Sequence, residues 1–222
     1  NRTGDEHALA MVKHKLDAMR MGGIYDHLGY GFHRYSTDAE WKVPHFEKML
    51  YDQAMLALAY LETFQATGED KYKSTAEEIF TYVLRDMTHS KSGFYSAEDA
   101  DSEGEEGKFY VWSKDEIYNV LGKKDADIFC EAYNVKDDGN FREEATGEQK
   151  GNNILHLKTS YSQIADNLGI SEDKLEKSLE ESRKKLFEVR EKRVHPFKDD
   201  KILTDWNGLM IAAFAEGAKL LN

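Results

Sequence analysis

The sequence is poor in cysteine and proline and lacks any long apolar run: its 222 residues include one cysteine and two prolines. A single cysteine cannot form an internal disulfide, so a reducing, cytoplasmic environment is expected. A membrane-spanning helix needs about 18 or more consecutive apolar residues, so no span is predicted. No signal peptide is recognised either. Cys130 follows Ile128 and Phe129 and is predicted to be a buried structural thiol.

Positive charge is also scarce. Lys and Arg number 30 against 42 Asp and Glu, which gives a formal net charge of −12. Binding to nucleic acid requires clustered Lys and Arg, and binding to an anionic membrane surface requires the same, so neither partner is expected. The motifs HExxH, CxxC, GxSxG and GxxxxGK[ST] are absent, which removes the zincin, thioredoxin-type, serine hydrolase and P-loop classes. No metal site and no cofactor are predicted.

Helical periodicity covers most of the chain. Thr3 and Glu6 match a capping box at the start of the first helix, and Gly22 marks its end. Pro44 suits the first turn of the second helix. The predicted helices are residues 4–21, 44–66, 70–87, 114–121, 124–133, 160–167, 171–190 and 205–221.

These helices are of two kinds. Residues 171–190 carry a single apolar stripe, as a helix with one wet face does. Residues 49–64 and 209–215 are apolar on every side, and such helices must be surrounded by other elements. The alternation predicts an all-α fold with inner and outer helices, the arrangement of an α/α barrel or toroid. Short β-hairpins are expected where residues 93–99 pair with 108–112, and within 141–157.

Residues 22–52 combine four glycines and three histidines with many aromatic side chains. Glycines let a backbone turn tightly, and aromatic and convergent polar groups are typical of a small-molecule pocket. On a helix, His45 and Asp52 would share one face. They are predicted to act as acid and base, although Asp52 could instead pair with Lys48 four residues earlier.

A second polar group, residues 204–208, opens the other all-apolar helix. Because inner helices of a toroid run parallel, both helix starts are expected on one rim. Simple capping by Thr204 or Asp205 is the alternative. The acidic run 98–106 could bind Ca²⁺ or form a solvated turn, and Asp99 and Asp101 are its better site candidates.

The expected roles follow from side-chain chemistry. Carboxylates and His can transfer protons, aromatic rings offer apolar faces to a small-molecule ligand, and Arg and amide groups can bind hydroxyls. The predicted catalytic residues are His45, Asp52 and Asp205. The predicted substrate-binding residues are Asp26, His33, Arg34, Trp41, Glu47, Tyr51, Asp99, Asp101, Trp206 and Asn207.

Three motifs carry a family resemblance: GGIYDHLGYGFHRYSTDAEWKVPHFEKMLYDQA, SAEDADSEGEEGKFYVW and KILTDWNGLMIAA. They resemble the spermatogenesis-associated thioredoxin-domain-containing proteins. The resemblance implies a six-hairpin α/α toroid, similar to N-acylglucosamine 2-epimerases and to glycosidases of that fold. Residues 1–222 match about half of that toroid and not the thioredoxin-like domain, so redox chemistry is not carried over.

Three hypotheses follow. The first is a carbohydrate-active or carbohydrate-binding domain, either a sugar epimerase or isomerase or a glycoside hydrolase, with a sugar or sugar derivative as ligand. The second is a non-catalytic binding or scaffold domain, so whether the chain is an enzyme stays open. The third is a partial toroid that self-associates through residues 49–64 or 209–221, because large apolar patches seek partners.

Overall fold

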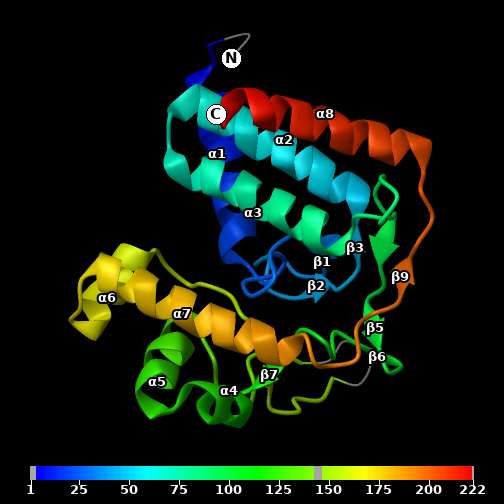
Figure 1. Ribbon diagram of the computed structural model, residues 1–222. Helices are drawn as coiled ribbons and strands as arrows, with labels where there is room; N and C mark the ends of the chain where they lie inside the picture. The colour runs from blue at the N-terminus through cyan, green and yellow to red at the C-terminus, as the bar shows by residue number, and fades with distance from the viewer. Residues whose placement is uncertain (1–3, 143–146, 222) are drawn as a thin grey trace.

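The computed structural model describes residues 4–142 and 147–221 (Figure 1). Its helices are α1 (Glu6–Met21), α2 (Leu50–Thr67), α3 (Asp70–Asp86), α4 (Lys114–Leu121), α5 (Lys123–Ala132), α6 (Tyr161–Leu168), α7 (Glu172–Arg190) and α8 (Thr204–Leu220). Its two-residue strands are β1 (Tyr35–Ser36), β2 (Pro44–His45), β3 (Lys48–Met49), β4 (Ala97–Glu98), β5 (Asp101–Ser102), β6 (Glu105–Glu106), β7 (Trp112–Ser113), β8 (Asn152–Asn153) and β9 (Lys198–Asp199). The predicted all-α class with short β-hairpins is confirmed.

Helices α3, α2 and α8 form a layer in which α2 lies between the other two (Figure 1). Gly68 ends α2 in the left-handed conformation, which lets the chain reverse into the antiparallel α3. Helix α8 runs parallel to α2, since Tyr51 and Trp206 at their first turns are in ring contact. Parallel neighbours of this kind are expected of the inner helices of an α/α toroid. The described residues form an open segment and not a closed barrel.

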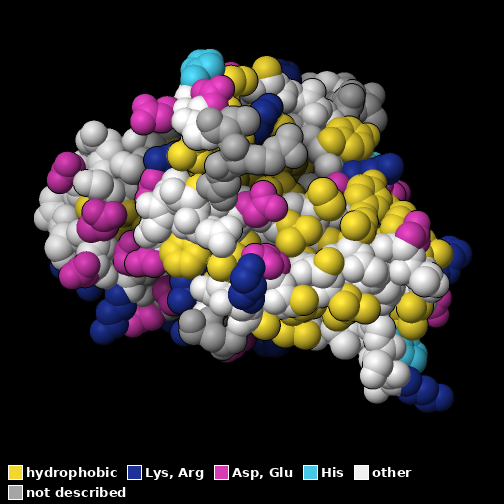
Figure 2. Space-filling view, turned by 90° about the horizontal axis from the view of Figure 1, so that it is seen from above, with side chains coloured by type: hydrophobic (Ala, Val, Ile, Leu, Met, Phe, Trp, Pro, Cys, Tyr) yellow, Lys and Arg dark blue, Asp and Glu magenta, His cyan; other side chains and the backbone are white. Residues whose placement is uncertain are grey.

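Helix α8 is less buried than its sequence predicts. Leu209 is 37% exposed and Ile211 61% exposed, and Met55 on α2 is 53% exposed. Figure 2 shows hydrophobic side chains gathered over this face. Helix α8 packs on α2 on one side, and the described part of the chain supplies no layer on its other side. The expectation that both helices are fully surrounded is therefore wrong for this chain.

Helices α4–α7 build a second hydrophobic core below the first (Figure 1). Cys130 is buried in this core, as predicted, and burial raises the pKa of its thiol to about 11. Such a thiol is unreactive at neutral pH. The start of α4 is fixed by a capping box between Ser113 and Glu116.

The strands pair differently from the prediction. The expected hairpin of 93–99 with 108–112 does not form: β4 lies between β3 and β9, while β5 pairs with β6. Strand β8 pairs with β7 and not within 141–157. Part of that predicted hairpin, residues 143–146, lies outside the described residues. The β3–β4–β9 sheet matters because β3 leads into α2 and β9 leads towards α8.

Two predicted helix starts are wrong. The cap of α1 is Asp5, whose carboxylate accepts hydrogen bonds from the backbone N–H groups of His7 and Ala8; Thr3 lies outside the described residues. The second helix begins at Leu50, because Pro44 and His45 are held as β2 against β1. The other helix boundaries agree with the prediction within about one residue, the usual scatter at helix ends.

A buried ion network ties the two cores together. Asp26, in the loop after α1, accepts hydrogen bonds from Arg190 at the end of α7, at 2.7 and 2.9 Å. Lys48 of β3 donates to the same carboxylate at 2.8 Å. All three side chains are almost fully buried. Arg190 and Lys48 hold the pKa of Asp26 well below its usual range, although burial alone would raise it.

Candidate functional site

A polar and aromatic cluster lies where α2 and α8 begin. We call it the rim cluster and define it as Arg34, His45, Glu47, Tyr51, Asp52, Glu106 and Trp206. The rings of Tyr51 and Trp206 meet edge to face, with centroids 4.8 Å apart. This contact brings together residues 155 positions apart in the sequence, and it confirms that the two helix starts share one end of the layer.

A chain of charged groups runs across the cluster. Arg34 donates to Glu47 at 2.9 Å and to the Tyr51 hydroxyl at 3.2 Å. The same Glu47 oxygen lies 3.3 Å from His45 Nε2, and His45 Nδ1 lies 2.7 Å from Glu106. His45 therefore bridges two carboxylates, one from its own loop and one from the β5–β6 hairpin.

Asp52 is the unpaired acid of the cluster. Its Oδ2 atom is buried and has no hydrogen-bond partner among the described residues. Burial raises the pKa of Asp52 to about 6; Arg34 acts in the opposite direction and Glu47 adds to the rise. A carboxyl group that titrates near neutral pH can both accept and donate a proton.

The route by which His45 and Asp52 come together differs from the prediction. His45 lies in β2 and Asp52 in α2, so they share no helix face. Both side chains instead interact with Glu47. His45 contacts the Glu47 carboxylate directly, and the negative charge of Glu47 helps to raise the pKa of Asp52. The proposed pair of Asp52 with Lys48 is also wrong, since the Lys48 ammonium is buried against Asp26.

The residues from the start of α8 divide into two groups. Trp206 joins the rim cluster, and the adjacent Asp205 is exposed and accepts a hydrogen bond from the Trp206 N–H. Asn207 is buried and fully engaged: it accepts from the N–H of Phe94 and donates to the carbonyls of Phe94 and Leu203. Its amide holds the loop after α3 against α8.

Asp26 and His33 are buried groups with local partners. Asp26 belongs to the ion network with Lys48 and Arg190. His33 contacts the Phe46 carbonyl at 2.9 Å through Nδ1, and burial, helped by Lys48, lowers its pKa to about 3. A neutral imidazole in this position donates to the carbonyl and stabilises the loop.

Three further predicted residues lie outside the rim cluster. Trp41 packs against the first core and faces the Lys15 ammonium, 4.6 Å from its ring. Asp99 and Asp101 are exposed, and the backbone N–H of Asp101 donates to the Asp99 carboxylate. Among the described residues, no three His, Cys, Asp or Glu side chains are grouped as ligands of a metal ion.

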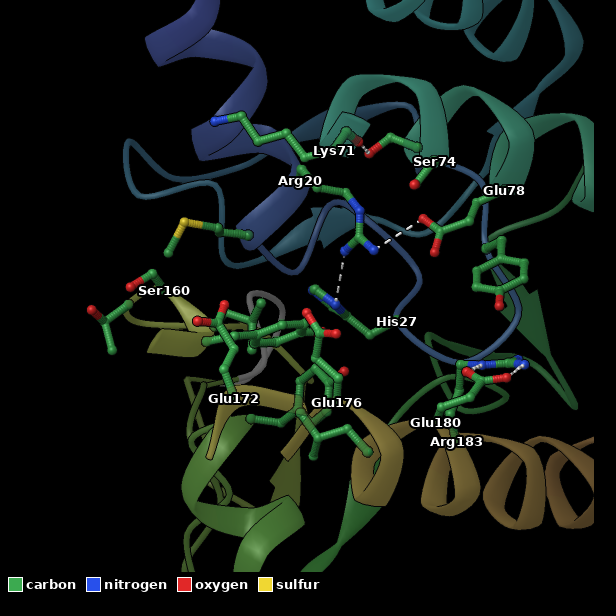
Figure 3. Close-up of a pocket in the computed structure, with 18 residues that line it drawn as sticks. Arg20, His27, Lys71, Ser74, Glu78, Ser160, Glu172, Glu176, Glu180 and Arg183 are labelled. Carbon is green, nitrogen blue, oxygen red and sulfur yellow. Dashed lines mark hydrogen bonds and ion pairs between the residues drawn. The ribbon is translucent and has the colours of Figure 1, made fainter. Parts of the chain in front are cut away.

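A cavity of about 500 Å³ lies between the two cores. Figure 3 shows Arg20 of α1 pointing towards His27 and Glu78, with Glu172 and Glu176 of α7 on the opposite wall. None of the predicted site residues lines this cavity. Its walls come from α1, α3, α6 and α7, which are far apart in the sequence, and from His27 and Tyr30 of the glycine-rich segment 22–52, so only that part of the wall carries a local sequence signal.

Some of the polar groups that line this cavity are paired with one another. Arg20 donates to Glu78 at 3.0 Å, and Glu78 also accepts from the Tyr25 hydroxyl. Burial and the nearby Arg20 lower the pKa of His27 to about 3, so its ring is neutral. The rim cluster holds a titratable acid, Asp52, with a buried oxygen that has no partner among the described residues.

The class of protein is thus an all-α domain segment with a polar site at the parallel starts of two helices. No family model matches the sequence. The chain is 41% identical to human spermatogenesis-associated protein 20 over 94% of its own length and 29% of that protein. It is 39% identical to the mouse protein of that name, over 94% of this chain and 28% of the relative. An uncharacterized protein of Caenorhabditis elegans is 36% identical over 94% of this chain and 31% of its own length.

The chain is therefore homologous to a segment of the spermatogenesis-associated proteins, and the resemblance carried by its three motifs is confirmed. It spans less than a third of the length of these relatives. A solved structure described as a sugar epimerase from a ruminal bacterium aligns with 98% of this chain over 66% of its own length. The aligned sequences are 14% identical, and the TM-score is 0.40. No helix in the described ranges has the length and apolar character to cross a membrane.

Proposed function

We propose that the rim cluster is a carbohydrate-binding site in which Asp52 serves as the acid–base group. The single observation that carries this proposal is the Asp52 carboxyl: its Oδ2 is buried without a partner and its pKa is raised to about 6. A buried unpaired carboxyl costs stability, and it is commonly retained where a ligand supplies the missing partner.

The surroundings of Asp52 suit a sugar. The Tyr51 and Trp206 rings offer apolar faces of the kind on which sugar rings pack. Arg34 and Glu47 offer a donor and an acceptor for hydroxyl groups, and their mutual ion pair fixes both in place. Epimerisation, isomerisation and hydrolysis of a sugar all require proton transfer, which a carboxyl with a pKa near 6 can perform.

The test is calorimetric titration of the full-length protein with a panel of neutral monosaccharides at pH 5 and pH 8. The affinity for the sugar is expected to differ between the two pH values, with the transition near pH 6, because Asp52 ionises there. Asp52→Asn should remove that pH dependence and weaken binding by about tenfold or more, since a hydrogen bond to a charged group is lost.

Glu62→Gln is the matched control, since Glu62 is an exposed carboxylate on the same helix. It should bind as the unmodified protein does. If Asp52→Asn binds with the same affinity and pH profile as Glu62→Gln, Asp52 is not the acid–base group. If no sugar binds, the carbohydrate proposal fails.

A non-catalytic scaffold is the second candidate, and the exposed apolar face on α8 favours it. The two functions differ in turnover. A product detected by NMR after incubation with a bound sugar, and absent with Asp52→Asn, favours the enzyme; binding without product favours the scaffold.

A further inference from the structure

The charges of the rim cluster bear on which sugars it can accept. Arg34 stands against three carboxyl groups, those of Glu47, Asp52 and Glu106. Anionic ligands such as sugar phosphates need a cation whose charge is not already offset by a carboxylate. The ion pairing of Arg34 therefore determines whether the site can hold an anion.

The charge of Arg34 is already offset. Its Nη1 donates to Glu47 and its Nε to the Tyr51 hydroxyl, so Glu47 neutralises the guanidinium and both partners orient it, while two of its five N–H donors are used in these bonds. Lys48 of β3 cannot serve as the cation either. Its ammonium group is 2% exposed and donates hydrogen bonds to Asp26 and to the Tyr30 carbonyl.

The remaining carboxylate also faces the cluster. Glu106 arrives from the β5–β6 hairpin and is held there by His45. An added phosphate would therefore meet Glu47, Glu106 and the ionised Asp52 at close range. Repulsion between these carboxylates and the phosphate lowers the affinity for a phosphorylated sugar, whereas an uncharged sugar does not experience it.

We infer that the rim cluster selects uncharged or amino sugars and rejects phosphorylated or carboxylated ones, and that Glu47 is the residue that sets this specificity by occupying Arg34. The inference rests on the proposed carbohydrate function and names the substrate class of that same site. It predicts a gain of function: freeing Arg34 should let the site accept an anion.

The experiment is calorimetry on the full-length protein with glucose, glucosamine and glucose 6-phosphate, followed by other neutral hexoses with their amino and phosphate derivatives. The unmodified protein should bind a neutral or amino sugar at least about tenfold more tightly than its phosphate. Raising the salt concentration should narrow the difference, because salt screens repulsion between partly exposed charges.

Glu47→Gln should raise affinity for the phosphate by about tenfold and lower affinity for the neutral sugar, because Glu47 is also a proposed hydroxyl acceptor, so the ratio of the two affinities shifts towards the phosphate. The matched control is Glu106→Gln, which removes the same charge nearby but leaves Arg34 paired with Glu47. It should change the phosphate affinity much less. The double variant Arg34→Gln/Glu47→Gln should lose the gain, since the freed cation is gone.

The outcomes separate the two proposals. If the phosphate binds the unmodified protein as tightly as the neutral sugar, or if only phosphates bind, the specificity inference is overturned while carbohydrate binding stands. If Glu47→Gln and Glu106→Gln raise the phosphate affinity equally, the specific role of Glu47 is overturned, since the loss of any one negative charge would then explain the effect. If no sugar of any charge binds, the proposed function falls and the inference falls with it. Should Glu47→Gln not fold, the comparison in the unmodified protein still decides the selectivity.

Discussion

At the residue scale, identical side-chain types serve different purposes according to their partners. Asp26 and Asp52 are both partly or fully buried aspartates of one continuous segment. Two cations surround Asp26 and its pKa is lowered, whereas Asp52 lacks a partner and its pKa rises to about 6. Burial alone would raise both, so the neighbouring charges decide.

Asn207 gives the first prediction at this scale. Its amide makes two hydrogen bonds that join α8 to the loop at Phe94 and a third to the Leu203 carbonyl just before α8. Asn207→Ala should lower the free energy of unfolding by about 1–3 kcal/mol, because partly buried backbone groups of Phe94 lose their partner. Urea denaturation measures this. Asn119→Ala, at an exposed position of α4, should leave stability nearly unchanged. A small and equal effect of both substitutions would contradict the structural role of Asn207.

At the scale of elements, the molecule depends on connections between helices that are far apart in the sequence. The end of α7 reaches the loop after α1 through Arg190 and Asp26, and Lys48 joins β3 to the same point. Strand β3 leads directly into α2, which carries Tyr51 and Asp52. The buried network thus anchors the strand that leads into α2, and none of its members belongs to the rim cluster.

Arg190→Ala should destabilise the protein by about 3–5 kcal/mol, since it leaves a buried carboxylate without one of its two cations. Lys184→Ala on the same helix is the control: its exposed pair with Glu180 contributes about 0–1 kcal/mol. Thermal and urea unfolding compare the two variants. Equal small losses would show that the network contributes little.

The same network sets a dependence on pH. The folded-state pKa of Asp26 is lowered, so its stabilisation is present above the unfolded-state pKa near 4 and is lost as pH falls through the folded-state value. Urea unfolding of the unmodified protein below pH 4 should show this loss, and Arg190→Ala should show less of it. The opposite trend would contradict the assignment.

At the scale of the whole molecule, two hydrophobic cores lie on either side of the cavity of about 500 Å³, and α8 forms one outer surface (Figures 1 and 2). Leu209, Ile211 and Met55 remain exposed on that surface. An exposed apolar patch on a helical layer attracts further apolar surface.

The 222-residue chain is therefore expected to self-associate in a concentration-dependent manner. Ile211→Lys should shift sedimentation towards monomer, because a charge at the centre of an apolar contact must be desolvated. Val194→Lys is the control, since Val194 is similarly exposed but lies outside α2 and α8. A monomer at all concentrations in the unmodified chain would contradict this expectation.

Local sequence patterns predicted the helices well, because apolar periodicity and caps act within a few residues: α4 and α7 begin next to the serines that cap them. Strand pairing could not be predicted in the same way. Each strand has two residues, and the partner of Ala97 lies as far away as Asp199. Pro44 suited a helix start by its own geometry, and pairing with Ser36 placed it in a strand instead.

For the site, the sequence by itself determined which chemical groups are available: carboxyls, histidine, arginine and aromatic rings near two helix starts, together with the family to which the segment is related. Only the tertiary structure decided how these groups are used. It put Asp26, His33 and Asn207 into internal hydrogen bonds and left Asp52 unpaired beside Tyr51 and Trp206. The reason is physical: the pKa and availability of a polar side chain depend on burial and on neighbours within a few ångströms, and those neighbours come from distant parts of the sequence.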